Sequence, residues 1–174
     1  IEPILTSLIK KGHPYVGFLY FGLMIVEGKP FVIEYNVRFG DPEAQTVLPL
    51  LKTSIFDICF SAVNKNLKNI KISYKNKFSV CVVLAAKGYP GHYDKGCEIN
   101  GLNNKLSNNE LIFHAGTMLK DGKWVTDGGR VLSIVCMSNK LIDAIDKTYH
   151  LADKIQYNNK YNRMDIAKKG LCYI

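Results

Sequence analysis

The chain has 174 residues, a hydrophobic content of 47% and a formal net charge of +8. This composition is typical of a soluble globular protein, and no apolar run approaches the ~20 residues of a membrane span, so we expect no membrane partner. The lysines are scattered among asparagines and form no dense stripe with aromatic residues, which favours a solvated surface over a nucleic-acid-binding patch.

The first predicted element is a β-hairpin. Residues 14–25 (PYVGFLYFGLMI) and 31–39 (FVIEYNVRF) are rich in β-branched and aromatic residues, and Gly28 stands at a turn position between them. Residues 43–64 are predicted to be helical, with a fresh start near Pro49 and Ser54 as a helix cap. The polar, lysine-rich run 65–77 is the best candidate for a domain boundary.

A second unit is predicted from Phe78 onward. Residues 79–91 form a buried-type strand that ends in glycines and a proline, and further strands are expected within 111–119, 124–129 and 130–137. Residues 140–155 place apolar side chains at helical intervals. The sequence therefore predicts two α+β domains, residues 1–70 and 71–174, the second of them mostly antiparallel.

The strand 31–39 alternates apolar and polar residues. Because strand residues two apart share a face, one face is predicted to be core: Ile33, Tyr35, Val37 and Phe39. Glu34, Asn36 and Arg38 point the other way. The plain interpretation is an exposed polar edge on which Glu34 and Arg38 form a weak surface pair.

The same polar face also suits a metal and a phosphate. Oxygens from Glu34 and Asn36 could hold Mg²⁺, and the planar fork of Arg38 suits a phosphate or an acyl phosphate. The loop that follows, Gly40 to Glu43, permits a tight turn and adds two carboxylates. Asp41 is also expected to cap the next helix, with Pro42 at its first position.

Two motifs here resemble a known family. The E-x-N pattern of Glu34 and Asn36 is similar to the Mg²⁺-binding element of ATP-grasp ligases. The string RFGDPEAQ, preceded by GFLYFGLM, resembles the signature of the phosphoribosylamine–glycine ligases, also called glycinamide ribonucleotide synthetases. Later stretches resemble landmarks of that family's carboxy-terminal domain: SVCVVLAAKGYPGHYDKGCEINGL, FHAGT, TDGGRVLSIV and YNRMDI. The resemblance covers nearly the whole chain; E-x-N alone is weak, whereas RFGDPE followed by GGRVL is highly specific.

The resemblance implies the carboxy-terminal part of an ATP-grasp domain, a hairpin with helices, followed by a small, mostly antiparallel α+β domain. It implies an ATP-dependent carbon–nitrogen ligase of de novo purine biosynthesis, joining glycine to 5-phosphoribosylamine through glycyl phosphate. The products would be glycinamide ribonucleotide, ADP and phosphate. Mg²⁺ or Mn²⁺ would bind Glu34 and Asn36, ATP would contact these two residues with Leu23 or Met24, and Arg38 and Asp41 would be catalytic.

The chain also departs from the family's pattern. It is less than half the family's length and lacks the glycine-rich loop that covers the ATP phosphates, so we expect it to need the missing amino-terminal part of the same enzyme. Many ATP-grasp enzymes have an acidic metal ligand on the preceding strand; that position falls near Gly22, which leaves a second metal open. The alternative function is a stand-alone, non-catalytic structural or binding module.

The remaining features set the compartment and leave some questions open. The five cysteines include no C-x-x-C pair, which argues against a zinc knuckle or a disulfide framework and favours a cytoplasmic protein. The chain begins at Ile1 and not at a methionine, so an amino-terminal part is expected to be missing. The oligomeric state is open, with a monomer favoured, as are the individual roles of Asp41, Glu43 and Arg130.

Overall fold

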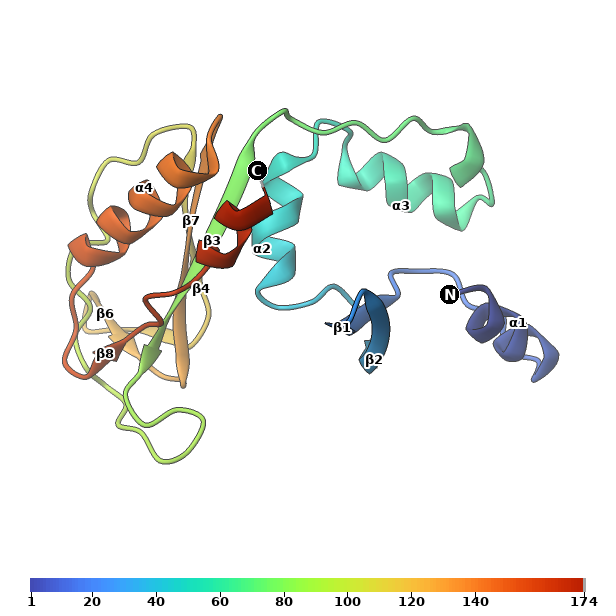
Figure 1. Cartoon of the computed structure of the whole chain (residues 1–174). Coiled ribbons are helices and arrows are strands. Elements are labelled where there is room, and N and C mark those ends of the chain that lie inside the picture. Colours follow the sequence, from blue (N-terminus) through green and yellow to red (C-terminus); the bar gives the residue numbers. More distant parts are fainter. Residues whose placement is uncertain (174) are drawn as a thin grey trace. The chain divides into compact units, whose positions relative to one another are not determined.

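In the computed structural model, which describes residues 1–173, the chain divides into two compact units (Figure 1). The first unit comprises Ile1–Glu43 and Leu51–Tyr74. The second comprises Ala44–Leu50 and the chain from Lys75 onward. None of the helices within the described residues is both long enough and apolar enough to cross a bilayer.

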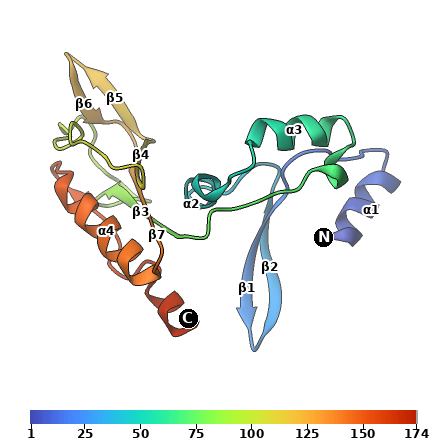
Figure 2. The same ribbon diagram turned by 90° about the horizontal axis from the view of Figure 1, so that it is seen from above.

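The first unit is built on the predicted hairpin, which Figure 2 shows from above. Strand β1 (Tyr20–Val26) pairs antiparallel with β2 (Lys29–Asn36). Glu27 and Gly28 form the turn, both with positive φ, as the twist of a tight hairpin requires. The prediction of a hairpin is confirmed, although β1 begins later than the predicted strand.

Helices complete the first unit. They are α1 (Glu2–Lys10), α3 (Ile55–Val63) and the short 3₁₀ helix η2 (Leu67–Asn69). The predicted cap of α3 is confirmed, because the Ser54 hydroxyl accepts a hydrogen bond from the Asp57 amide at 3.4 Å. Helix α1 was not predicted from the sequence, because its mixed polar and apolar residues were not recognised as a helical pattern.

The predicted core face of β2 is wrong for this chain. Ile33 and Val37 are 64% and 72% exposed, Tyr35 is also exposed, and only Phe39 is partly buried. Within the described residues β1 and β2 pair only with each other. A hairpin without further strands or a covering layer cannot bury an apolar face, so alternation identified the face but not its burial.

The second unit contains a mixed core of sheet and helix. Its main sheet has the strand order β4-β7-β3-β8 within the described chain, and every pairing in it is antiparallel. These strands are β3 (Phe78–Ala86), β4 (Glu110–His114), β7 (Arg130–Ser138) and β8 (Lys160–Tyr161). A separate hairpin joins β5 (Thr117–Lys120) to β6 (Lys123–Thr126). The prediction of an antiparallel α+β domain is confirmed.

Helices lie against this sheet. Helix α4 (Leu141–Lys154) runs along one face, as Figure 2 shows. It buries Leu151 and Ala152 in one cluster with Val82 and Ile134, and Ala144 in another with Val80. The remaining helical segments are α2 (Glu43–Val47), η1 (Leu48–Leu50) and η3 (Lys168–Tyr173). Residues of α2 and η1 line an apolar pocket of about 380 Å³ with Leu111 and Phe113 of β4.

The glycine-rich landmarks of the second unit meet at one end of the sheet. Gly116 of FHAGT packs directly on Gly128 of TDGGR, and a Cβ on either would collide with the other's backbone. The ring of Tyr89, from the loop after β3, lies against Gly129. These glycines therefore permit close packing where the base of the β5-β6 hairpin meets the loop after β3.

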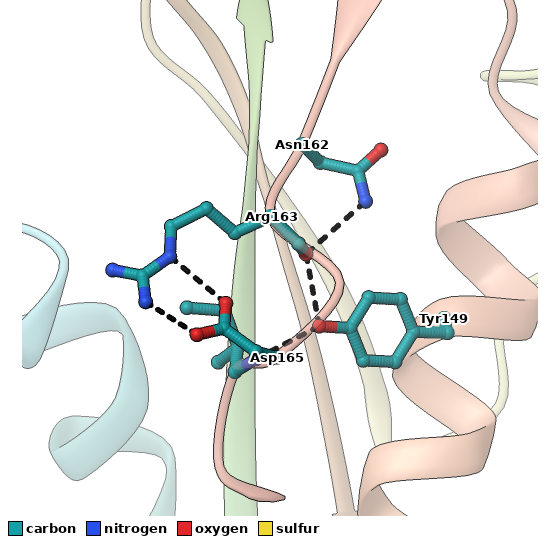
Figure 3. Close-up of polar contacts among 5 residues, drawn as sticks. Tyr149, Asn162, Arg163 and Asp165 are labelled. Atoms are coloured by element: carbon teal, nitrogen blue, oxygen red, sulfur yellow. Dashed lines mark hydrogen bonds and ion pairs between the residues drawn. The ribbon is translucent and has the colours of Figure 1, made fainter.

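The terminal YNRMDI segment is fastened to α4 (Figure 3). The Tyr149 hydroxyl donates to the Arg163 carbonyl at 2.9 Å and accepts from the Ile166 amide at 3.1 Å. Arg163 also forms a two-point pair with Asp165, at 2.9 and 2.6 Å, which lowers the pKa of the Asp165 carboxyl. This landmark therefore has a structural role in closing the second unit.

Candidate metal and phosphate site

All six predicted site residues lie in the first unit, on the hairpin and the loop that follows it. Glu34 and Asn36 are two apart on β2, opposite Gly22 and Tyr20 of β1. Residues that pair directly across strands share a face, so these four positions form one surface. The structure thus brings the predicted metal ligands together on one side of the hairpin.

Gly22 gives the Glu34 side chain its place on that surface. A Cβ added at Gly22 would lie 2.8 Å from Cγ of Glu34, closer than a Cβ approaches any atom in practice. The Glu34 side chain therefore lies across the backbone of β1, in space that a larger residue would occupy. A side chain at Gly22, where many ATP-grasp enzymes have a second acidic ligand, would meet Glu34.

Arg38 and Asp41 follow the end of β2. Arg38 is exposed, and its Nη1 donates to the carbonyl of the next residue, Phe39, at 2.7 Å. Asp41 is exposed in the turn, and the Asp41–Pro42 peptide bond is cis. Helix α2 begins at Glu43, one residue later than the predicted first helical position at Pro42.

Leu23 and Met24, the predicted adenine contacts, are both about half exposed on β1. Leu23 and Met24 are neighbours on β1, so alternation directs their side chains to opposite faces. The register of the hairpin shifts between Gly22 and Leu23: Gly22 pairs with Glu34, Leu23 with Val32 and Met24 with Phe31. Both residues therefore lie beyond this irregularity, on the turn side of the predicted metal ligands.

Sequence reasoning missed the aromatic residues that surround this loop. The Tyr20 hydroxyl donates to Glu43 Oε1 at 3.1 Å, and the rings of Phe18 and Phe39 lie 3.9 Å apart. Desolvation, followed by the hydrogen bond to Glu43 and nearby carboxylate charge, raises the pKa of Tyr20. The aromatic density of PYVGFLYF was visible in the sequence, but it indicated only a strand.

The donor set of this surface fits a hard cation. No group of three or more His, Cys, Asp or Glu side chains within residues 1–173 is arranged to hold a metal. Mg²⁺ does not require one, because it commonly binds through one or two carboxylates and completes its shell with waters and phosphate oxygens. The carboxylate of Glu34 and the amide oxygen of Asn36 are donors of that kind.

Comparison with known proteins agrees with the fold and with the sequence motifs. The family model "Phosphoribosylglycinamide synthetase, C domain" matches residues 79–169, and the model "Phosphoribosylglycinamide synthetase, ATP-grasp (A) domain" matches residues 1–44. A phosphoribosylamine–glycine ligase of Caldanaerobacter subterraneus is 45% identical over 96% of this chain and 40% of its own length. The trifunctional purine biosynthetic protein adenosine-3 of Gallus gallus is 40% identical over 100% of this chain and 17% of its own length.

Solved structures give the same result. The crystal structure of a phosphoribosylamine–glycine ligase from Thermotoga maritima matches 92% of this chain and 39% of that chain, with 40% identity and a TM-score of 0.72. The biotin carboxylase domain of a Hydrogenobacter thermophilus 2-oxoglutarate carboxylase matches 91% of this chain and 36% of that chain, at 14% identity and a TM-score of 0.59. The second likeness shows the fold alone.

The hairpin with its helices and the small antiparallel domain are therefore the carboxy-terminal portion of an ATP-grasp protein. The C-domain match extends over more than half of the chain. The chain belongs to the phosphoribosylglycinamide synthetase family. It spans about 40% of the length of the phosphoribosylamine–glycine ligases that it matches.

Proposed function

We propose that this chain is the carboxy-terminal part of an ATP-dependent ligase that joins glycine to 5-phosphoribosylamine in purine biosynthesis. The observation that supports this most directly is the surface formed by Glu34 and Asn36, with the RFGDPE turn beginning at the end of the same strand. Relatives with 40–45% identity and names of such ligases support the reaction class. The five free cysteines are consistent with a cytoplasmic enzyme.

The proposed reaction has two steps. A glycine carboxylate oxygen attacks the γ-phosphorus of ATP, which forms glycyl phosphate and releases ADP. The amine of phosphoribosylamine then attacks the acyl carbon, the phosphate leaves, and the nitrogen loses a proton. The first step supplies a leaving group that a carboxylate lacks.

Each site residue has a proposed role in these steps. Glu34 and Asn36 would hold Mg²⁺ or Mn²⁺, which would supply positive charge to offset the negative charge of the ATP phosphates. Arg38 gives up its bond to a neighbouring carbonyl and binds the transferred phosphoryl group through two nitrogens. Asp41 binds the amino group of one of the two amine substrates, and Leu23 or Met24 borders the adenine.

The exposed faces of the hairpin support a role for the rest of the same polypeptide. Apolar side chains on both faces of β1 and β2 are about half exposed or more, including Met24 on one face of β1, Ile25 on its other face, and Ile33 of β2. Isolated hairpins are marginal in water, and the relatives extend well beyond the matched portion. We propose that residues 1–70 complete an ATP-grasp domain with that missing part, and that residues 71–174 form the carboxy-terminal domain.

The test compares the complete protein with the 174-residue chain. Both are incubated with ATP, glycine, phosphoribosylamine and Mg²⁺, and glycinamide ribonucleotide is measured. We expect product from the complete protein and none from the chain alone. Failure of the complete protein to form product would refute the ligase and favour a non-catalytic module, and turnover by the chain alone would refute the need for the missing part.

A further inference from the structure

The turn after β2 is closed by a contact that neither the motif nor the proposed reaction requires. The Tyr20 hydroxyl, at the start of β1, donates to Glu43 Oε1 at 3.1 Å. Tyr20 stands directly opposite Asn36, one of the two proposed metal ligands. Glu43 is therefore tied to the strand pair that presents the metal surface, although it lies several residues beyond β2.

The side chains of Tyr20 and Glu43 pack closely against Gly40. Gly40 is buried, and a Cβ at that position would collide with the Glu43 carboxylate and would lie 2.9 Å from Cε2 of Tyr20. The two side chains thus meet over the backbone of the turn. A residue other than glycine would force Tyr20 and Glu43 apart.

A second contact holds the same turn from the other end. The rings of Phe18 and Phe39 lie 3.9 Å apart with an interplanar angle of 34°. Tyr15 Oη lies 2.8 Å from the Phe18 carbonyl and 3.4 Å from the Val37 carbonyl. Aromatic side chains before β1 therefore fasten the backbone on either side of Arg38.

We propose that Glu43 is a positioning residue: through its bond to Tyr20 it holds the turn that places Arg38 and Asp41 beside the metal surface. It does not bind substrate or metal and transfers no proton. The inference rests on the proposed function and adds a role for two residues to it. Oε1 of Glu43 already accepts the hydrogen bond from the Tyr20 hydroxyl, and Oε2 lies against Gly40.

This role predicts that Glu43 needs an acceptor but not a charge. In the complete protein, Tyr20→Phe and Glu43→Ala should each lower kcat about tenfold, with KM for ATP and glycine changed less than kcat, because misplacement acts mainly on the reacting geometry. Glu43→Gln keeps an oxygen that can accept from Tyr20 and should stay within about threefold of the parent. The double variant Tyr20→Phe/Glu43→Ala should be no slower than either single variant.

Tyr35→Phe is the matched control, since it removes a hydroxyl from the opposite face of β2. It should leave kcat unchanged. If Glu43→Gln is as slow as Glu43→Ala, or the two losses add in the double variant, the carboxylate acts directly and the positioning role is wrong.

Hydrogen exchange provides a readout that does not depend on turnover. Amides of residues 38–41 and of residue 43 should exchange at least several-fold faster in Tyr20→Phe and Glu43→Ala than in the parent and in Glu43→Gln. Unchanged exchange in Tyr20→Phe would overturn the proposal even in a fully active enzyme. If the parent is inactive but its variants still show this exchange pattern, the proposed function is refuted. The structural role of the hydrogen bond between Tyr20 and Glu43 is then still supported.

Discussion

The absence of a side chain at Gly22 leaves the space in which the side chain of Glu34 lies. Glycine is usually placed in a strand for backbone reasons, but here the empty space beside its Cα is used by a side chain from the next strand. The sequence alone showed an acid missing near Gly22. The structure shows that an acid at that position would displace the one at Glu34.

Gly22→Ala therefore tests the surface directly. The added Cβ meets a flexible side chain and no backbone, so the free energy of unfolding should change by less than about 1 kcal/mol. In the complete protein, displacement of Glu34 should raise the Mg²⁺ concentration required for half-maximal turnover severalfold. Gly28→Ala is the control, because it strains a turn with φ of +76° without approaching Glu34. An unchanged Mg²⁺ requirement in Gly22→Ala would show that Glu34 is not placed by this contact.

At the scale of elements, the carboxylate of Glu110 stabilises the turn that leads into β4. The Ser107 amide donates to Glu110 Oε2 at 2.8 Å, and this bond, aided by the charges of Lys154 and Lys147, lowers the pKa of Glu110 below its usual 4.5. A lowered pKa means that the unfolded state binds more protons. The stabilisation is therefore complete above pH 4.5 and is lost as the pH falls through the folded-state value.

Glu110→Gln should remove this pH dependence. Melting temperatures measured from neutral to acidic pH should show the variant below the parent at pH 7, with the gap closing as the pH falls below 4.5. The reason is that a neutral amide keeps an acceptor oxygen but has no proton to gain. A gap that stays constant over the whole range would show that the carboxylate's charge contributes nothing.

The β1-β2 hairpin and the four-stranded sheet should also differ in how much stability they lose when an apolar side chain is shortened. In the 174-residue chain, Ile134→Ala in β7 removes a fully buried side chain and should lower the free energy of unfolding of the second unit by about 2–5 kcal/mol. Ile33→Ala in β2 removes an exposed one and should cost the first unit less than about 0.5 kcal/mol. Urea unfolding followed separately in each unit distinguishes the two. A large cost at Ile33 would mean that β2 is covered in solution.

These elements also show what the sequence could and could not predict. Alternation in 31–39 and the turn at Gly28 predicted the hairpin, and Ser54 predicted the start of α3, because both signals are local. Burial of Ile33 was predicted wrongly, since burial depends on what packs against a strand. The hydrogen bond from Tyr20 to Glu43 joins residues that are 23 apart in the chain, and no local sequence pattern indicates such a contact. The family motif indicated the surface of Glu34 and Asn36, but not the contacts that shape it.

At the scale of the whole molecule, the exposed hairpin and the length of the relatives lead to one expectation. The first unit offers the surface of the proposed metal ligands and apolar strand faces, while the family match accounts for 40% of the length of a related ligase. We therefore expect Glu34 to act only in the complete protein. Its charge should matter to the reaction, while its contribution to folding should be small, because it is an exposed strand residue.

The most direct measurement is steady-state kinetics of the complete protein over a Mg²⁺ titration, comparing Glu34→Gln with the parent and with Glu27→Gln in the exposed turn. Thermal melts of the same proteins verify that each is folded. The account predicts that Glu34→Gln melts like the parent but turns over at least tenfold more slowly and requires more Mg²⁺, while Glu27→Gln behaves like the parent. Normal turnover and normal Mg²⁺ dependence in Glu34→Gln would contradict the metal site and with it the proposed role of this surface.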